Sequence, residues 1–343
     1  AGDNIVNAAE VAAGQTLTGK VSNAASGDTV TIILGGQTYT ATVQDDLTWS
    51  LPLTQSQLTA LGNGDLTVSA SVTNAHGNTG SSSLDVTIDA QLPGLRIDTV
   101  AGDDVINVIE HAQNLVISGT STDLAAGSTV TVTINGKSYS ASVLADGTWQ
   151  AAVPAADVSR WADGSLTISA SAQDTSGNPV NIGTVVDVDL APVAISINSV
   201  TDDNVLNAAE KGQDLVLSGS SSNVEAGQTV TIIFAGKTWT TTVDANGDWT
   251  CTVPAADLSG LKDGDASVQV SVTNVNGNAA SSSQAFSVDT AAPAVTINTI
   301  SGDNMLNAAE AAQDLTLSGT STAEAGQTVT VTFNGNQYTA QVQ

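Results

Sequence analysis

Polar and apolar residues alternate over short stretches of this chain, and turn-forming residues separate the stretches. The segment Thr129–Ile134 alternates over its whole length, which is typical of a strand with one buried face. Asn135-Gly136 follows it and favours a tight hairpin, because both turn positions accept a positive φ. A second turn, Asp146-Gly147, predicts another hairpin, which leads into a strand containing Trp149. The chain is therefore expected to consist of short β-strands.

Helical periodicity is confined to short segments such as residues 107–113 and 154–159. Between residues 91 and 190, the alternation predicts seven strands, at about residues 96–100, 115–121, 129–134, 137–143, 148–153, 165–173 and 183–189. Seven short strands in roughly 100 residues, with an inward Trp and no Cys pair, fit an immunoglobulin-like β-sandwich. Trp149 is assigned to the core, since its strand alternates and aromatic residues make up only 3% of the chain.

The same pattern returns every 100 residues. The segment Ala1–Glu10 reappears at 101–110, 201–210 and 301–310, and Gly19 and Trp49 recur with that period. This period corresponds to a small domain rather than to one turn of a solenoid. Proline-bearing joints without a Gly/Ser-rich tether separate the domains, so neighbours should nearly touch. We predict an all-β, elongated rod of tandem immunoglobulin-like β-sandwich domains with about seven strands each. The domains are repeat 1 (residues 1–90, first strand missing), repeat 2 (91–190), repeat 3 (191–290) and repeat 4 (291–343, truncated).

The charge balance excludes several classes of function. Seven Lys and Arg residues against 34 Asp and Glu residues give a net charge of −27. Nucleic-acid binding requires clustered basic residues, so nucleic-acid partners are excluded. No apolar run approaches the roughly 20 residues that a membrane-spanning helix needs, so membrane insertion is not expected. Self-repulsion at this charge favours an extended, soluble chain, which we expect to be monomeric.

No constellation of catalytic residues is recognisable. His76 and His111 stand at unrelated positions in their repeats, and histidine-based triads require a positioned imidazole with partners. The single cysteine, Cys251, cannot form an internal disulfide, and it alternates in phase with Trp249 and Val253. That phase predicts a buried thiol. We therefore expect a non-enzymatic protein that is held together without disulfides.

Acidic residues gather near the predicted joints between repeats. In repeat 2, Asp103 and Asp104 lie between the first and second strands, and Asp189 ends the last strand. Alternating strand directions predict that both places lie at the same end of the sandwich. Across the joint, repeat 3 would contribute Asn223 and Asn274 from two loops at its facing end. Converging carboxylate and amide oxygens favour Ca²⁺, which takes about 6–8 oxygen ligands in flexible geometry.

A purely structural interpretation of the same residues stays open. Asp-Asn pairs also form turns, and Asn107 and Glu110 could cap a short helical turn. EF-hand spacing does not occur in the sequence, so the calcium prediction rests on recurrence and topology.

Three motifs recur in register along the chain: Gly-Asp-Asn-x-Leu-Asn-Ala-Ala-Glu, the run Leu315–Ser321, and Val-Thr-Asn-x-x-Gly-Asn followed by Val-Asp-Thr-Ala-Ala-Pro. In these motifs the chain resembles the bacterial Ig-like repeats of giant type I-secreted adhesins, of the biofilm-associated protein type. The resemblance implies a long extracellular stalk on the bacterial surface, rigidified by calcium between successive domains. The calcium ligands that it implies are Asp3, Asp89, Asp103, Asp104, Asp189, Asp203 and Asp289. Asn4, Asn204 and Asn304 stand where Asp104 does, which implies joints that differ in ligand number.

These observations together predict a non-enzymatic stalk segment that projects an adhesive tip for attachment or biofilm formation. Ligands on host cells, abiotic surfaces or the biofilm matrix would be bound by other regions of the parent protein. The alternative is that the repeats themselves recognise a glycan or a protein, as modules of a secreted adhesin or an exported enzyme. That alternative predicts exposed aromatic residues repeated on one face, whereas Trp161 and Trp239 do not recur.

Overall fold

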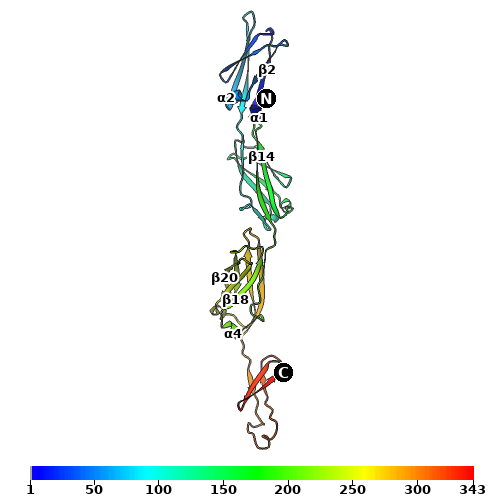
Figure 1. The fold of residues 1–343 in the computed structure, drawn as a ribbon, viewed down its shortest axis with the longest axis vertical. Helices are drawn as coiled ribbons and strands as arrows, with labels where there is room; N and C mark the ends of the chain where they lie inside the picture. Colours follow the sequence, from blue (N-terminus) through cyan, green and yellow to red (C-terminus); the bar gives the residue numbers. More distant parts are fainter. Residues whose placement is uncertain (1) are drawn as a thin grey trace. The chain divides into compact units, whose positions relative to one another are not determined.

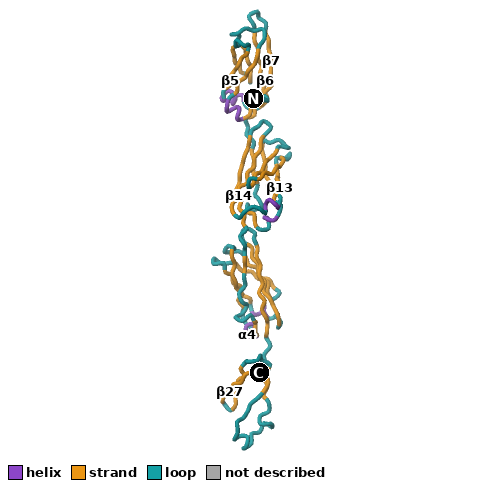
Figure 2. Tube along the Cα trace, turned by 90° about the vertical axis from the view of Figure 1, so that its right-hand side faces the viewer, coloured by secondary structure: helices purple, strands orange, loops and turns teal. Residues whose placement is uncertain are grey.

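The computed structural model describes residues 2–343, which form strands joined by turns and a few short helices (Figure 1). Figure 2 shows the strands in orange and the short helices in purple. Two compact units divide the chain: Ala1–Ala191, with repeats 1 and 2, and Pro192–Gln343, with repeats 3 and 4. In the described residues, no helix is long and apolar enough to cross a membrane.

Repeat 2 shows the architecture most completely, with two facing sheets. The first sheet has the order β13-β10-β8 and the second has the order β12-β11-β14-β15-β9. The first sheet comprises β8 (Gly94–Ile97), β10 (Leu115–Thr122) and β13 (Thr148–Val153). The second comprises β9 (Val105–Asn107), β11 (Thr129–Ile134), β12 (Lys137–Ser142), β14 (Gly164–Gln173) and β15 (Pro179–Asp189). Two sheets of this order form an immunoglobulin-like sandwich, which confirms the predicted fold class.

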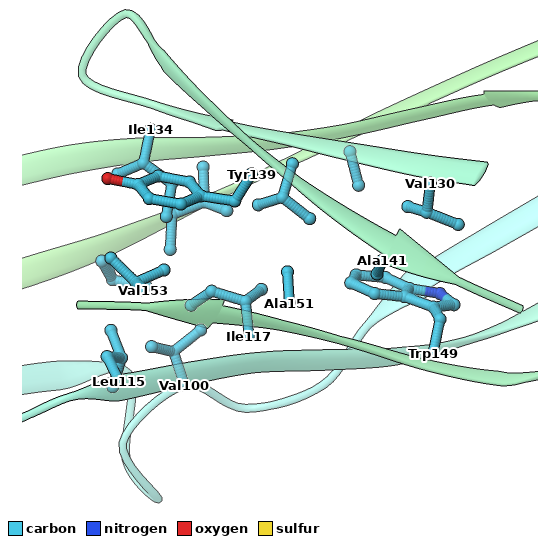
Figure 3. Packing of buried hydrophobic residues seen from close by; sticks show 14 of the residues in the cluster. Val100, Leu115, Ile117, Val130, Ile134, Tyr139, Ala141, Trp149, Ala151 and Val153 are labelled. Carbon is cyan, nitrogen blue, oxygen red and sulfur yellow. The ribbon is translucent and has the colours of Figure 1, made fainter.

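The core of repeat 2 lies between these sheets. Trp149 is 1% exposed and its indole N–H donates to the backbone oxygen of Thr120 at 3.2 Å. In Figure 3 its ring lies beside Ala141, while Tyr139 lies at the other end of the cluster beside Ile134. The alternation of the strands places every second side chain in this layer. The prediction that the recurring Trp belongs to the core is confirmed.

Repeat 2 contains an eighth strand that the sequence pattern does not reveal. β9 covers three residues within the connection predicted between the first and second strands, and it pairs in parallel with β15. Three residues are too few for an alternating pattern to stand out. β9 occupies the edge of β15 that faces away from β14.

The turn at Asp146-Gly147 is not a hairpin, contrary to the sequence prediction. A local turn does form there, with the N–H of Leu144 donating to the oxygen of Thr148 at 2.8 Å. However, the flanking strands β12 and β13 belong to opposite sheets. The turn therefore carries the chain across the sandwich. By contrast, Asn135-Gly136 joins the hydrogen-bonded strands β11 and β12 with φ of 48° and 75°, as predicted.

Repeats 1 and 3 follow the same plan. Repeat 1 has sheets β1-β7-β6-β3-β4 and β2-β5, and repeat 3 has sheets β17-β23-β22-β19-β20 and β16-β18-β21. The strands of repeat 1 are β1 (Ile5–Asn7), β2 (Gln15–Lys20), β3 (Thr29–Leu34), β4 (Gln37–Thr42), β5 (Thr48–Leu53), β6 (Gly64–Thr73) and β7 (Thr79–Asp89). Those of repeat 3 are β16 (Ala194–Ile195), β17 (Val205–Asn207), β18 (Leu215–Ser222), β19 (Thr229–Phe234), β20 (Lys237–Thr242), β21 (Asp248–Val253), β22 (Gly264–Thr273) and β23 (Ala279–Asp289). Within residues 2–90, no strand corresponds to β8 or β16.

Repeat 4 contains two strand pairs, β24-β25 and β26-β27. Their bounds are β24 (Val295–Ile297), β25 (Gly319–Ser321), β26 (Thr328–Phe333) and β27 (Asn336–Gln341). Several of its large apolar side chains are exposed, including Met305 and Leu306.

Repeats 1, 2 and 3 each contain two short helices. They are α1 (Ala8–Ala13), α2 (Gln55–Leu61), η1 (Glu110–Ala112, a 3₁₀ helix), α3 (Ala155–Val158), α4 (Ala208–Lys211) and α5 (Ala255–Leu258). α1 and α2 are in contact in repeat 1 (Figure 1), as are η1 and α3 in repeat 2. The two helical segments predicted in repeat 2 correspond to η1 and α3.

Candidate functional site: the joint between repeats

The strand that the sequence did not reveal decides which residues reach the end of the sandwich. The parallel register of β9 and β15 sets Val105 beside Asp187 and Asn107 beside Asp189. Asp103 therefore lies about four residues back from Asp189, or roughly 13 Å at about 3.3 Å per residue. The sequence predicted that Asp103 and Asp104 converge with Asp189. The register differs from this prediction, because β9 lies between these two residues and the end of the sheet, so that Asn107 stands beside Asp189 instead. β1 and β17 have the same register with β7 and β23.

Asp3, Asp103 and Asp203 share a local role within their own turns. In each, the Oδ1 atom accepts a hydrogen bond from the backbone N–H two residues further along. The distances are 3.1 Å for Asp3, 3.0 Å for Asp103 and 2.9 Å for Asp203. The N–H of Val205 and, to a smaller extent, the hydroxyl of Thr201 hold the pKa of Asp203 below its usual range.

The position of Asp104 needs a left-handed backbone and an acceptor oxygen. Asp104 has φ 64°, and its Oδ1 accepts from the N–H of Val100 at 2.8 Å. Asn204 has φ 60°, and its Oδ1 accepts from the N–H of Val200 at 3.0 Å. Asp and Asn both tolerate this conformation and both supply the oxygen. The replacement of Asp104 by Asn in the other repeats is explained by this geometry, which needs no charge.

Asn107 and Glu110 cap the turn that follows β9. The Oδ1 of Asn107 accepts from the N–H of Glu110 at 3.1 Å, and the Oε2 of Glu110 accepts from the N–H of Asn107 at 3.1 Å. Asn7 and Glu10 form the same capping box at the start of α1. The capping interpretation of these residues is confirmed.

The joint between repeats 1 and 2 lies within one compact unit and is closed by direct hydrogen bonds. Asn178 of repeat 2 is 1% exposed; its Oδ1 accepts from the N–H of Ala8 at 2.8 Å and its Nδ2 donates to the backbone oxygen of Asp89 at 2.9 Å. The hydroxyl of Ser176 donates to the Asp89 carboxylate at 2.6 Å. One buried amide thus bonds to two segments of repeat 1 that are far apart in sequence and lie side by side at the end of the β1–β7 pair. Such a contact restrains the angle between the two domains.

Asp174 holds the loop that carries this amide. Its Oδ1 accepts from the N–H groups of Ser176 and Asn178 at 2.9 and 2.8 Å, and its Oδ2 accepts from the Nδ2 of Asn178 at 2.8 Å. Beside this loop, the Oδ2 of Asp123 accepts from the Nε2 of Gln91, in the connection between the repeats, at 2.8 Å. Carboxylates of both repeats therefore lie around the joint: Asp89 on one side, Asp123 and Asp174 on the other.

Asn223 and Asn274, in repeat 3, occupy the positions of Asp123 and Asp174. Asn274 is buried, and its Oδ1 accepts from the N–H groups of Asn276 and Asn278 at 3.1 and 2.9 Å. Asn223 donates from its Nδ2 to the backbone oxygen of Pro192 at 2.8 Å. These two residues and Asp189 belong to different compact units, and within their own unit Asn223 and Asn274 organise the loops.

A residue that sequence reasoning missed holds the exit of each last strand. The Oδ1 atoms of Asn63, Asp163 and Asp263 accept from the N–H groups of residues 90, 190 and 290 at 3.0, 2.7 and 3.0 Å. The Oδ1 atoms of Asp89, Asp189 and Asp289 each accept a hydrogen bond from the backbone N–H two residues further along, at 3.3, 3.0 and 3.0 Å. The 100-residue recurrence at positions 63, 163 and 263 is the signal that could have found the first set. Both sets tie the connection to the domain that precedes it.

Asp263 has an additional partner, because the hydroxyl of Thr290 also donates to its Oδ1, at 2.6 Å. The hydroxyl and the backbone N–H of Thr290 together lower the pKa of Asp263. Cys251 packs at the edge of its core, half-buried rather than fully buried, and burial raises the pKa of its thiol.

The acidic side chains of the described residues are not clustered around a common point. Within residues 2–343, no three His, Cys, Asp or Glu side chains stand together in a group that could hold a metal ion. At the first joint, however, the available donors are carboxylate, amide and backbone oxygens from both repeats, which is the chemistry that Ca²⁺ prefers. The donor set fits a hard cation, although the side chains now bond to one another.

Comparison with known proteins relates this chain to surface proteins of bacteria. The bacterial Ig-like domain family matches residues 202–290. A solved structure of a Ca²⁺-stabilized adhesin with which an Antarctic bacterium binds ice is 34% identical and covers 99% of this chain and 85% of its own, with a TM-score of 0.42. A 1.5-MDa bacterial ice-binding adhesin is 33% identical over 84% of this chain and 95% of its own, with a TM-score of 0.42.

A tetra-tandem repeat from the extending region of a large adhesion protein is 30% identical. It covers 98% of this chain and 87% of its own, with a TM-score of 0.34. No curated protein matches the chain. Neither the Ig-like family nor these three structures indicate a catalytic family.

Proposed function

The chain belongs to the bacterial Ig-like repeats of giant surface adhesins, and from that membership we propose that it is a calcium-stiffened extender. In this role the repeats carry an adhesive region away from the cell and catalyse no reaction. The parent protein is exported by type I secretion and serves attachment to cells, surfaces or a biofilm matrix. The adhesive ligand is bound by another region of the parent.

The observation that carries this proposal is the direct contact between repeats 1 and 2. A flexible linker would leave the facing loops solvated, whereas the side chain of Asn178 is almost fully buried and bonds to Ala8 and Asp89. Each hydrogen bond of this kind contributes roughly 0.5–1.5 kcal/mol to stability, so the two bonds of Asn178 to repeat 1 oppose separation of the domains. Because the connection itself is bonded to Asn63 and Asp123, little free chain is left between the domains.

Charge supports a role for calcium at the same place. The chain carries −27 charges, and self-repulsion favours extension but opposes the approach of carboxylates at a joint. We propose that Asp89, Asp123 and Asp174 hold Ca²⁺ at the first joint, with the oxygens of the capped loops completing the site. Bound calcium would supply the positive charge that lets these carboxylates stay close.

The other residues that the sequence predicted as calcium ligands are proposed to have different roles. Asp189 and Asp289 end β15 and β23 as Asp89 ends β7, so they are the matching candidates at later joints. Asp3, Asp103, Asp104 and Asp203 lie further from the joint and are proposed to act through their turns. Asn223 and Asn274 stand at the positions of Asp123 and Asp174, and they are proposed to offer neutral amide oxygens to calcium where repeat 2 offers carboxylates.

Small-angle scattering and thermal unfolding of the full chain test the proposal. With millimolar calcium, the maximum dimension and the unfolding midpoint should rise above the values measured in chelator. The double variant Asp89→Asn, Asp174→Asn should lose most of this response. Asp85→Asn is the matched control, because Asp85 lies on the same strand as Asp89 and bonds to Thr67. An equal calcium response in all three proteins would refute calcium binding at this joint.

The alternative, ligand recognition by the repeats themselves, finds no specific support. The tryptophans that could form a stacking surface pack in or against the cores: Trp149 and Trp161 in repeat 2, and Trp239 and Trp249 in repeat 3. Saturable binding of a glycan or matrix protein to the full chain would favour the alternative. Its absence, together with a calcium-dependent length, would favour the extender.

A further inference from the structure

The short strand β9 and the last strand β15 of repeat 2 form a parallel pair between an early and a late segment of the domain. The N–H of Asp187 donates to the backbone oxygen of Asp104 at 3.0 Å, and the pairing continues from there as far as Asp189. Repeats 1 and 3 have the same pair, between β1 and β7 and between β17 and β23. All three repeats therefore fasten an early segment to their last strand.

The chain enters and leaves repeat 2 at opposite ends of β15. Asn178 directly precedes the first residue of β15, and its Nδ2 donates to the backbone oxygen of Asp89 in repeat 1. The connection from repeat 1 therefore reaches repeat 2 where β15 begins, whereas the chain leaves repeat 2 where β15 ends, at Asp189. Tension along the chain consequently pulls β15 toward its C-terminal end and pulls β9, through the residues before it, toward its N-terminal end.

Because β9 and β15 are parallel, the two pulls act in opposite directions along the strand axis. The hydrogen bonds of a parallel pair are evenly spaced, so they are stretched together and not one after another. If β8 is drawn off β10 first, β9 still holds the early segment to β15. A slip by one residue would move Ile106, which is 0% exposed, from the core face of the sheet to the solvent face. The pair therefore resists sliding.

The turn of residues 107–112 follows β9 and acts as a stop against this pull. The Oε2 of Glu110 accepts from the N–H of Asn107 at 3.1 Å, which closes the turn. The turn also contacts α3, because the Nε2 of His111 donates to the backbone oxygen of Trp161 at 3.0 Å. β9 cannot move toward its N-terminal end unless this turn separates from α3. Lys211 has the position of His111 in repeat 3 and donates to the corresponding oxygen.

We propose that the pair β9–β15, with the stop behind it, is a clamp that keeps repeat 2 folded when the chain is pulled from its ends. The matching pairs have the same role in repeats 1 and 3. The clamp rests on the extender role, because a stalk that holds a cell to a surface transmits the pull between them. It adds to that role a tension-bearing element made of protein bonds alone, which acts with or without bound calcium.

Force-clamp spectroscopy of the full chain, held by its two termini in chelator, measures the lifetime of each repeat under a constant pull. Repeats 1, 2 and 3 should unfold in three separate steps. Glu110→Ala should shorten the lifetime of one step about fivefold, the factor that one typical hydrogen bond contributes. His111→Ala, which leaves the bond between Glu110 and Asn107 in place, should also shorten one step, and the double variant should still affect a single step.

Asp146→Ala is the matched control. The carboxylate of Asp146 also accepts a backbone N–H, that of Thr148 at 3.0 Å, but its turn joins β12 and β13, neither of which pairs with β9 or β15. Its lifetimes under load should equal those of the unmodified chain. Unchanged lifetimes in both Glu110→Ala and His111→Ala would overturn the clamp, and so would an equal shortening in Asp146→Ala.

This test is separate from the test of the extender. A chain whose length does not respond to calcium would refute stiffening by calcium, yet the lifetimes measured in chelator would still follow the order predicted for the clamp. Conversely, a calcium-dependent length with equal lifetimes in all variants would leave the extender in place and overturn only the clamp.

Discussion

Gly119 is a position in the sandwich of repeat 2 where the neighbouring atoms leave no room for a side chain. It lies in β10 between Trp149 on β13 and Ile97 on β8. A Cβ atom at this position would lie 2.7 Å from Cε2 of Trp149 and closer still to the backbone oxygen of Arg96. An Ala side chain cannot be accommodated there unless the indole ring or the edge strand moves. The recurrence of Gly at positions 19, 119, 219 and 319 has this steric cause.

The expected cost of Gly119→Ala follows from two opposing terms. Overpacking a close-packed site costs typically about 1–3 kcal/mol, and the upper end applies because one of the obstructing atoms belongs to the backbone. Replacing Gly by Ala in a strand recovers about 0.5–1 kcal/mol of chain entropy. The net destabilisation is about 2 kcal/mol, equivalent to a roughly 30-fold lower equilibrium constant for folding of repeat 2.

Hydrogen-exchange mass spectrometry of the full chain measures this change in each repeat separately. In Gly119→Ala, protection of residues 94–97 and 115–122 should fall about 30-fold, whereas that of repeat 3 should not change. Gly183→Ala is the control, because a Cβ there lies 3.6 Å from the oxygen of Ile168, an ordinary contact. Equal protection in the two variants would refute the steric argument.

Three further predictions concern the joint and the cores. Asn178→Ala should raise the exchange rate of the Ala8 amide about tenfold or more, because that N–H loses its acceptor; Asn78→Ala, at the same position of repeat 1, should leave Ala8 unaffected. Since the folded pKa of Asp263 is lowered, its stabilisation is present above the unfolded value of about 3.9 and is lost as the pH falls through the folded pKa. In an NMR pH titration the Thr290 amide should therefore lose protection on acidification, whereas loss of the Ala90 amide in parallel would contradict this, because its acceptor Asn63 does not titrate. Trp239→Tyr should change the urea midpoint little, because the buried indole N–H of Trp239 has no hydrogen-bond partner among the described residues and repeat 2 has Tyr at this position. A fall of more than about 2 kcal/mol in the free energy of unfolding would show that the N–H is hydrogen-bonded in solution.

The sequence predicted which types of residue gather near the joints, but not which individual residues reach them. The recurrence of acidic residues predicted calcium ligands near the joints, and Asp89 lies at the first joint, where its carboxylate accepts a hydrogen bond from Ser176. Asp103 and Asp104 do not lie beside Asp189, because the three residues of β9 displace them along the sheet. Asn178, the most buried polar residue of the first joint, has no distinguishing sequence signal, since Asn78 also follows a Gly at the same position of repeat 1 and is exposed.

The sequence by itself determined the strands, the repeats and the Trp-centred core, because alternation of polar and apolar residues encodes which face of a strand avoids water. Only the tertiary structure decided which strands are partners. Alternation is a local property, whereas pairing depends on which edges meet, and this is why the Asp146-Gly147 turn crosses between sheets and the short strand β9 joins β15. The first joint was decided in the same way, since the hydrogen bonds of Asn178 join residues about 90 and 170 positions apart in the chain.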